Sequence, residues 1–172
     1  MIKLRTVGAT EWAAIEVALD GVLHPVPNIV LHSHSVVAED EGAVIGVAAV
    51  EVADAVGFLR LHFVSPAYRG QGLGTRIVRQ AVQNGFERGL TSVFVSAATF
   101  ETYYYRAGFG PDDFSFLPGC FWPRVASDRA HPPSVMSCRR GIGGRNSDGA
   151  NSQGDLRVNP CFVPRRDGDF GP

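Results

Sequence analysis

The sequence predicts one folded domain of mixed α/β (α+β) class. Two patterns indicate this class: short valine-rich runs of strand length in the first third of the chain, and a glycine-rich turn followed by apolar residues at helical spacing. The chain has 172 residues, of which 45% are hydrophobic, and this supply suffices for one buried core. Division into two domains would leave each half short of core.

The N-terminal segment predicts a strand, a helix and a loop. Residues 2–7 alternate apolar and polar side chains, as in a strand with one buried face. Thr10 can cap a helix over residues 11–19, where apolar residues recur at helical spacing. Residues 23–28 include two prolines, which disfavour a regular helix or a central strand. We therefore expect a loop there, in a position suited to substrate contacts.

A hairpin and a central strand are expected next. The valine-rich runs at residues 35–40 and 43–52 are separated by Glu41-Gly42, a pair typical of a tight hairpin turn. Residues 56–64 are mostly apolar on both faces, which is typical of a strand in the middle of a sheet. These patterns predict an antiparallel pair followed by a central strand.

The remaining elements alternate between helix and strand. A helix follows the glycine-rich turn, because apolar residues from Leu73 to Phe86 recur at spacings of three and four. After it we expect elements of decreasing regularity: a strand at 92–97, a short helix at 100–107 closed by Gly108, a strand at 109–117, a long loop at 118–133 and a final strand at 134–139.

The C-terminal segment differs from the rest in composition. Beyond Arg140 the chain is rich in Gly, Asn, Ser, Asp and Arg, which bury too little apolar surface to offset the ordering of the backbone. We therefore expect an independent domain over residues 1–140 and a disordered or loosely docked tail over residues 141–172. Within the tail, residues 156–163 could form an edge strand. An interaction function of this tail is one alternative reading of the protein.

The composition disfavours several classes of partner. The formal net charge is −1 and the pI is about 6.5, so there is no basic field to attract nucleic acid or an anionic membrane. No signal peptide or membrane-spanning run is visible, and we expect a cytoplasmic protein. The three cysteines lack metal or redox spacing. A small molecule or a local protein site is the expected partner, and a homodimer is compatible with this reading.

The glycine-rich turn at residues 69–75, Arg-Gly-Gln-Gly-Leu-Gly-Thr, is the clearest chemical signal. Placed between a strand and a helix, it brings main-chain N–H groups and the positive end of the helix dipole close to a ligand. This arrangement favours a pyrophosphate. The glycine spacing does not fit a dinucleotide-binding fingerprint, and the Lys of a P-loop is missing.

The turn resembles the signature of the GNAT acetyltransferase superfamily, Arg/Gln-x-x-Gly-x-Gly/Ala, through Arg69, Gly72 and Gly74. A second segment, residues 104–109, is similar to the Tyr-x-x-x-Gly-Phe element of that family. The resemblance covers roughly residues 1–140. It implies a mixed, mostly antiparallel sheet of about six to seven strands with about four flanking helices, splayed between the fourth and fifth strands. The walls of that gap would be residues 58–64 and 92–97.

The resemblance also implies a coenzyme and a reaction. Acetyl-CoA would be the co-substrate, an amine would be the acceptor, and the pantetheine arm would lie in the gap of the sheet. Backbone groups near His62 to Val64 would bind the pantetheine, and those of the turn would bind the pyrophosphate. The implied coenzyme-binding residues are Phe63, Val64, Arg69, Gly70, Gln71, Gly72, Leu73, Gly74 and Thr75.

Acetyl transfer requires a neutral amine and a proton for the departing thiolate. By resemblance Tyr104 would supply that proton, although a packing role for Tyr104 remains open. Some family members carry Glu or His at the positions of Phe58 and Arg60 on the central strand. His62, two residues beyond Arg60 and expected on the same strand face, is the nearest titratable candidate for the base. A packing role for His62 and a chain of water molecules remain alternatives.

Other polar residues are weaker candidates. Glu39 and Glu51 could also act as a base. His24, His32 and His34 lie near the prolines, and His32 and His34 have a spacing that places both rings on one side of an extended chain. A third ligand is not in sequence reach, so we predict no metal site. Because the central strand lacks the usual carboxylate, a non-catalytic acyl-CoA-binding sensor or partner subunit is the main alternative function. The sequence does not identify the acceptor.

Overall fold

The computed structural model describes residues 1–19, 34–97, 100–112, 115–121 and 135–141. The chain divides into two units, Met1–Arg140 and Gly141–Pro172, and the description below concerns the first. The loop expected at residues 23–28 lies outside the described residues. So do His24, His32 and the edge strand expected at residues 156–163.

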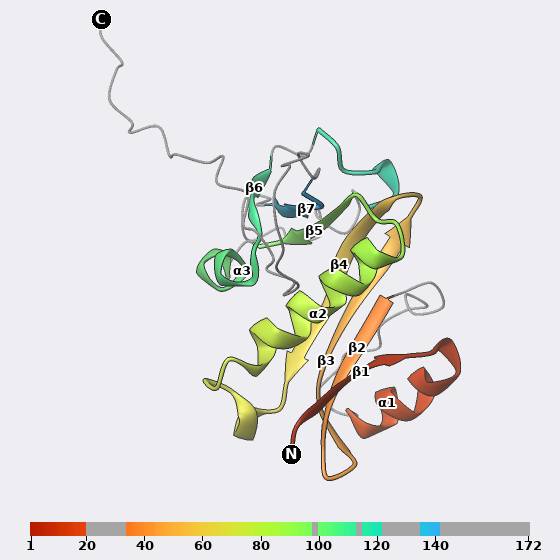
Figure 1. The fold of residues 1–172 in the computed structure, drawn as a ribbon, viewed down its shortest axis with the longest axis vertical. Helices are drawn as coiled ribbons and strands as arrows, with labels where there is room; N and C mark the ends of the chain where they lie inside the picture. The colour runs from red at the N-terminus through yellow and green to blue at the C-terminus, as the bar shows by residue number, and fades with distance from the viewer. Residues whose placement is uncertain (20–33, 98–99, 113–114, 122–134, 142–172) are drawn as a thin grey trace, which may run out of the picture. The chain divides into compact units, whose positions relative to one another are not determined.

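A seven-stranded sheet forms the centre of the first unit (Figure 1), as the sequence predicts. Its spatial order is β1-β2-β3-β4-β5-β7-β6, and every neighbouring pair is antiparallel except β4–β5. In chain order the strands are β1 (Lys3–Val7), β2 (His34–Asp40), β3 (Ala43–Ala53), β4 (Val56–Val64), β5 (Ser92–Ser96), β6 (Gly110–Asp112) and β7 (Val135–Arg139).

Three α-helices, α1 (Trp12–Ala18), α2 (Leu73–Glu87) and α3 (Glu101–Ala107), accompany these strands in the described residues, against the expected four or so. Three short 3₁₀ turns, at Ala9–Glu11, Pro66–Tyr68 and Gly119–Phe121, complete the described elements. The longest helix, α2, has 15 residues. None of the described helices combines the length and apolar content needed to cross a lipid bilayer.

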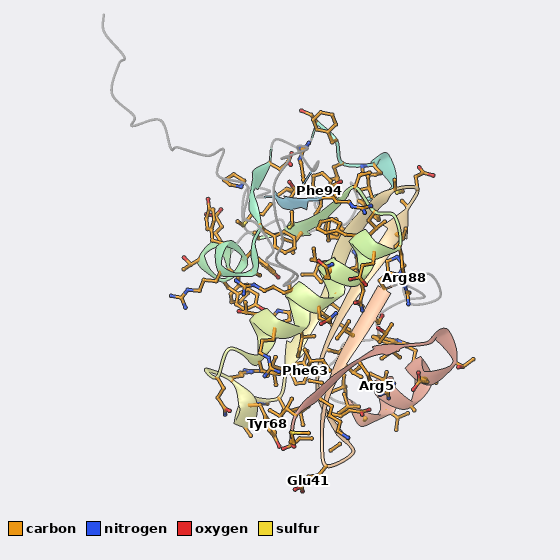
Figure 2. The ribbon with its side chains drawn as sticks, in the orientation of Figure 1. Arg5, Glu41, Phe63, Tyr68, Arg88 and Phe94 are labelled. Atoms are coloured by element: carbon orange, nitrogen blue, oxygen red, sulfur yellow. The ribbon has the colours of Figure 1, made fainter. Side chains whose placement is uncertain are left out.

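The two faces of the sheet are covered by different helices. α2 lies along β3 and β4 (Figure 1) and packs against alternate residues such as Val36, Ala48 and Val50. The intervening residues Val37 and Val47 contact Trp12, Ile15 and Leu19 of the α1 segment instead. This alternation follows from the twofold side-chain period of a strand. A third cluster, containing Phe58, Phe94 and Phe121, lies at the end of the sheet away from the start of α2, where Figure 2 labels Phe94.

Several local features follow the sequence closely. The turn between β2 and β3 has Glu41 at φ 50° and Gly42 at φ 84°, the left-handed pair that a tight hairpin requires. Gly108 ends α3 at φ 101°, as expected for a residue just after a helix. The strand expected at residues 109–117 is shorter and ends at Asp112.

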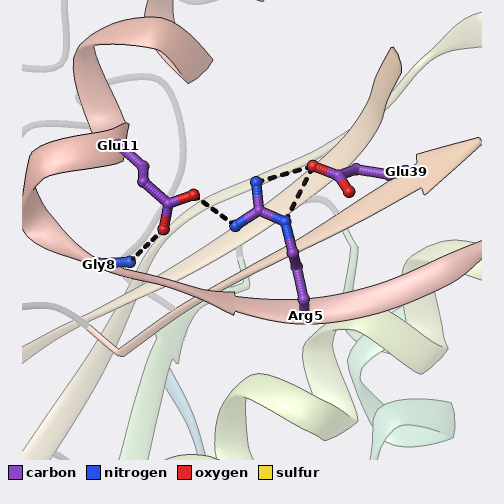
Figure 3. A network of polar contacts seen from close by, with 4 residues as sticks. All are labelled: Arg5, Gly8, Glu11 and Glu39. Carbon is purple, nitrogen blue, oxygen red and sulfur yellow. Dashed lines mark hydrogen bonds and ion pairs between the residues drawn. The ribbon is translucent and has the colours of Figure 1, made fainter. Parts of the chain in front are cut away.

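The start of the first helix differs from the expectation that Thr10 caps it. Thr10 lies inside the 3₁₀ turn, and the Gly8 N–H donates instead to Glu11 Oε2 at 3.0 Å (Figure 3). Glu11 also accepts a bond from Arg5 Nη1 at 2.7 Å, and Arg5 donates two further bonds to Glu39 on β2. Arg5 lowers the pKa of Glu11, after the larger effect of the Gly8 hydrogen bond. Because this network is exposed, it adds little to the free energy of unfolding. Its main effect is to fix the backbone at the start of α1.

The parallel pairing of β4 with β5 depends on a glycine. Gly57 is paired with Val93, and a Cβ atom added at Gly57 would lie 2.6 Å from Val50 Cγ1 and 2.9 Å from Leu90 Cδ1. Real Cβ atoms do not approach that closely. A larger residue would therefore push β4, β5 or the end of α2 apart.

Gly57→Ala is expected to lower the free energy of unfolding by roughly 1–3 kcal/mol, the usual effect of overpacking a core. Gly110→Ala is the matched control, because a Cβ atom there meets nothing within 4 Å; its effect should stay within about 0.5 kcal/mol. Urea unfolding of both variants measures the difference. Equal stability of the two would show that the packing at Gly57 is not limiting.

Candidate functional site

The sheet parts between β4 and β5, as the resemblance implies. Their parallel pairing has only three registered pairs, from Val56 with Ser92 to Phe58 with Phe94. Beyond Phe58, in the described part of the chain, β4 pairs with β3 alone, while the end of β5 pairs with β7. One main-chain edge of β4 therefore lacks a strand partner over residues 59–64. Such an edge can pair with an extended ligand.

A β-bulge at Arg60 changes which side chains face α2. Ala49 is registered with Leu61 and Val50 with Leu59, so Arg60 is an extra residue on β4. Its Nε atom lies 3.3 Å from Glu51 Oε2 in an ion pair. The expectation that Arg60 and His62 share a face is therefore wrong. His62 is registered with Ala48, which packs on the α2 side, and it contacts the α2 start.

The turn after β4 is held by main-chain and side-chain contacts. The Ser65 N–H donates to Ile45 O at 2.8 Å, and Arg69 Nε donates to Val64 O at 2.8 Å. The Arg69 guanidinium also lies over the Phe63 ring, 5.8 Å from its centroid. Phe63 and Tyr68 lie at the end of the sheet where α2 begins (Figure 2). Through Nε, Arg69 therefore ties the turn back to the end of β4.

The glycines of the turn adopt the conformation that the motif requires. Gly70 and Gly72 have φ of 76° and 75°, and a Cβ atom on either would meet nothing within 4 Å. Gly72 is the N-cap residue of α2 and makes no side-chain cap hydrogen bond. The first N–H groups of a helix have no partner within the helix, and they carry its positive dipole end. They can therefore receive an anion such as a diphosphate.

His62 and Tyr103 meet over the third glycine of the turn. His62 Nε2 lies 2.9 Å from Tyr103 Oη, and the two rings stack with centroids 4.9 Å apart. A Cβ atom on Gly74 would lie 2.9 Å from His62 Nε2 and 3.1 Å from Tyr103 Oη. Only a glycine allows this approach. The pair connects β4 to α3, which follows β5 in the chain, at the place where the two strands have separated.

Burial determines the charge state of this pair. It lowers the pKa of His62 from 6.5 to about 4, so the ring is neutral at physiological pH. Burial also raises the pKa of Tyr103, with a further contribution from neighbouring Tyr104, while a hydrogen bond with Thr75 opposes the rise. Both groups are therefore uncharged between about pH 5 and pH 9.

The three consecutive tyrosines have three different environments. Tyr104, the residue singled out by resemblance, is 8% exposed and packs edge-on against Tyr103 and Phe109. Burial raises its pKa to about 12. Tyr105 is 48% exposed. Of the three, Tyr103 is the one that reaches His62, whereas the resemblance points to Tyr104. The spacing to the buried Ala107 does not distinguish them, because Tyr103 and Tyr104 lie four and three residues before it.

The weaker candidates from the sequence are engaged elsewhere. Glu39 accepts hydrogen bonds from Arg5, and Glu51 pairs with Arg60. His34 Nδ1 lies 2.9 Å from Arg88 Nη1, and burial, followed by the Arg88 charge, lowers the pKa of His34. Among the residues that the structure describes, no cluster of three His, Cys, Asp or Glu residues could hold a metal ion.

The parted sheet, the glycine turn and the start of α2 together form a site that can accept a ligand with a diphosphate and an extended arm. A model of the acetyltransferase (GNAT) family matches residues 12–109, more than half of the chain. The chain therefore belongs to the GNAT acetyltransferase family. No curated protein sequence matches the chain significantly.

Solved structures of acetyltransferases share this fold. N-acetylglutamate synthase from Neisseria gonorrhoeae, complexed with coenzyme A and N-acetyl-glutamate, has a TM-score of 0.65 and 16% identity over 81% of this chain. The chain spans 35% of the length of that synthase. The ribosomal-protein-S18-alanine N-acetyltransferase from Escherichia coli has a TM-score of 0.62 and 17% identity, covering 85% of this chain and 98% of its own. PaiA N-acetyltransferase from Thermoplasma acidophilum, complexed with coenzyme A, has a TM-score of 0.57 and 12% identity, covering 81% of this chain and 99% of its own.

The buried neutral His62 should make stability depend on pH. In the unfolded chain His62 binds a proton below about pH 6.5, whereas in the folded chain it does so only near pH 4. Its contribution is present above pH 6.5 and is lost as the pH falls towards 4. In His62→Gln the side chain at position 62 cannot titrate. Between pH 7 and pH 4 this variant should therefore lose less unfolding free energy than wild type, by up to roughly 3 kcal/mol.

Urea unfolding at several pH values measures this difference. His34 also contributes to the acid loss of stability, because its pKa is lowered too. Comparison of wild type with His62→Gln leaves that contribution unchanged and isolates His62. An identical pH dependence of the two proteins would mean that His62 is solvated in solution.

Proposed function

We propose that this chain is an N-acetyltransferase that binds acetyl-CoA and transfers the acetyl group directly to a primary amine of a small molecule or peptide. One observation carries the proposal: the β4 edge beyond Phe58, without a strand partner in the described residues, leads into the glycine turn and the start of α2. An extended arm can pair with such an edge, and a diphosphate can bind the helix N–H groups. Membership in the GNAT acetyltransferase family supports an acyl-CoA donor.

The coenzyme would be held mainly by main-chain groups. Val64 offers its main-chain groups at the open edge of β4, whereas those of Phe63, like the Ser65 N–H that donates to Ile45 O, face β3; the residues of the turn offer N–H groups to the diphosphate. The residues proposed for the diphosphate are Arg69, Gly70, Gln71, Gly72, Leu73, Gly74 and Thr75. Because the Arg69 side chain is already bonded to Val64 O, its role is to fix the shape of the turn.

The amine acceptor is supported by the family and by the names of similar structures. One is a synthase of N-acetylglutamate, and another is an N-acetyltransferase acting on an alanine of a ribosomal protein. Both names specify acetylation of nitrogen. Their identity to this chain is below 20%, so we extend only the reaction type to this chain and leave the acceptor itself undefined.

The acceptor amine must lose a proton before it can attack. An amine of pKa about 10.4 is neutral in roughly one molecule in 800 at pH 7.5. His62 is a poor base for it, because with a pKa of about 4 the transfer from the ammonium group would cost on the order of 9 kcal/mol. Phe58 is buried in an aromatic cluster, and Arg60 carries a positive charge. We therefore favour a chain of water molecules as the route for this proton.

The pH dependence of the rate tests this route. Below the pKa of the acceptor amine, kcat/KM should rise about tenfold per pH unit, because only the neutral amine reacts and His62 does not titrate in that range. Initial rates between pH 6 and pH 9, with an acceptor of known pKa, measure the slope. An inflection near pH 6.5 that disappears in His62→Gln would instead identify His62 as the base.

Coenzyme binding is tested by two glycine variants with the same backbone strain. Gly72 and Gly89 both have left-handed φ and open space at the Cβ position, but only Gly72 lies in the turn. Each change to Ala should lower the free energy of unfolding by roughly 1–2 kcal/mol. Only Gly72→Ala should also raise the Kd for CoA at least tenfold, because it reorients the N–H groups at the start of α2.

Isothermal titration calorimetry with CoA measures the affinities. Equal affinity of both variants and wild type would contradict binding of the diphosphate at this turn. Mass spectrometry of acetylated products after incubation with acetyl-CoA and a panel of amines then separates an enzyme from a non-catalytic acyl-CoA sensor. The sensor would bind CoA and yield no product.

A further inference from the structure

The two faces of β4 differ at the parted edge of the sheet. On the α2 side, Leu59 and Val64 belong to the apolar cluster that α2 covers. Because side chains alternate along a strand, Phe58 faces the opposite side, within the aromatic cluster, and Leu61 packs near α1 on that same face. Arg60 comes between these two residues in the chain. The α2 side is filled, so an acceptor must approach the parted edge on the opposite face, next to Arg60.

Arg60 and Glu51 form an ion pair on this opposite face. Arg60 Nε lies 3.3 Å from Glu51 Oε2. Glu51 stands between Val50 and Val52 of β3, which both pack on the α2 side, so its own side chain points away from α2. The side chains of Arg60 and Glu51 are 20% and 18% exposed, so a small solute can reach both. Charges that are partly removed from water act more strongly on a ligand than fully exposed ones.

The ion pair lies where the coenzyme arm would end. Between the diphosphate and the sulfur, the arm has two amide units and about as many chain atoms as four residues, which span at most roughly 14 Å. Val64, beside the turn that would bind the diphosphate, is four residues beyond Arg60 in β4, or roughly 13 Å of strand. An arm that pairs with the open edge therefore brings its reactive end close to Arg60.

Resting on the proposed function, we propose that Arg60 and Glu51 bind the acceptor, and that this acceptor is a free amino acid. The carboxylate of the amino acid binds the Arg60 guanidinium, and its amino group lies beside Glu51. Three observations carry the proposal: the position of the ion pair at the end of the coenzyme arm, its partial exposure, and its place between two apolar clusters on the face opposite α2.

The signs of the two charges select this class of acceptor. Glu51 attracts and Arg60 repels an acceptor that carries only an ammonium group, and the reverse holds for one that carries only a carboxylate. A free amino acid has both charges a few bonds apart, so it can lie antiparallel to the ion pair with each charge next to its opposite. A guanidinium has five N–H donors in a planar fork, which allows Arg60 to bind two carboxylates together. Polyamines and peptide N-termini lack the adjacent carboxylate and are disfavoured.

The same charges favour release of the product. The neutral amine attacks the thioester carbonyl and the new C–N bond forms, while the C–S bond breaks with its electron pair moving to sulfur. The nitrogen releases its surplus proton to water, and the thiolate takes a proton from water. The product is an N-acetyl amino acid, which keeps the carboxylate but has no ammonium group. Glu51 no longer attracts any part of it and repels its net negative charge.

The test compares each free L-amino acid with its carboxamide, which has the same side chain and amine but no carboxylate. In wild type, kcat/KM should be roughly 10- to 100-fold higher for the best amino acid than for its carboxamide, the effect of one charge-assisted hydrogen bond. Because the carboxylate also changes the pKa of the amine beside it, the rates are referred to the concentration of neutral amine. Arg60→Gln should reduce this preference to within about threefold. Arg5→Gln is the matched control, because Arg5 also forms an ion pair but lies on β1, three strands from β4.

Glu51→Gln separates binding of the acceptor from a structural role of the ion pair. This variant should raise KM for the amino acid but keep its preference over the carboxamide, because Arg60 remains. The N-acetyl product should also inhibit it more strongly than it inhibits wild type. A purely structural ion pair would instead lower the rates with amino acid and carboxamide equally in Arg60→Gln and Glu51→Gln. If Arg60→Gln fails to fold, the double variant with Glu51→Gln removes both charges and gives the same test.

Isothermal titration calorimetry gives a readout that does not depend on turnover. CoA-saturated wild type should bind the best amino acid at least tenfold more tightly than its carboxamide. Equal Kd and kcat/KM values for the two in wild type, or a preference that survives in Arg60→Gln, would overturn this inference and leave acetyl transfer intact. A wild-type protein that binds CoA but acetylates no amine would overturn the proposed function and this inference together.

Discussion

The separation of β4 from β5 after only three registered pairs is the constraint on which the rest of the site depends. Gly57 allows β4 and β5 to pair there, because a side chain at this position would collide with Val50 and Leu90. Beyond Phe58 the same strand keeps its bonds to β3 and so stays rigid while its other edge opens. A rigid strand with one open edge can bind a ligand without paying for its own ordering.

The fold could be predicted in large part because its signals are local. The Glu41-Gly42 turn and the periodic helix from Leu73 depend on the conformational preferences of nearby residues, and the structure confirms both. The α1 start was less predictable, because Glu11 and not Thr10 accepts the Gly8 N–H, and Arg5 donates to the same carboxylate. Arg5 is itself bonded to Glu39 on β2, and a single sequence does not reveal such a contact between distant segments.

The candidate site shows the same division. Glycines at positions 70, 72 and 74 are informative in the sequence because each has a physical reason: left-handed φ at the first two and a close approach at the third. The choice among three adjacent tyrosines has no such local reason. Their side chains point in different directions around α3, and only the packing of α3 against α2 and Phe109 decides which ring is buried.

The bulge at Arg60 links these observations. A strand alternates its side chains, so without the extra residue Leu61 and Phe63 would face α2, and His62 would lie on the face of Arg60. That register would place two apolar side chains over the start of α2 and remove the partner of Tyr103. With the bulge, Leu61 and Phe63 pack on the α1 side, and Arg60 keeps its ion pair with Glu51. One inserted residue therefore satisfies the apolar core on one face and supplies a neutral imidazole to the coenzyme turn on the other.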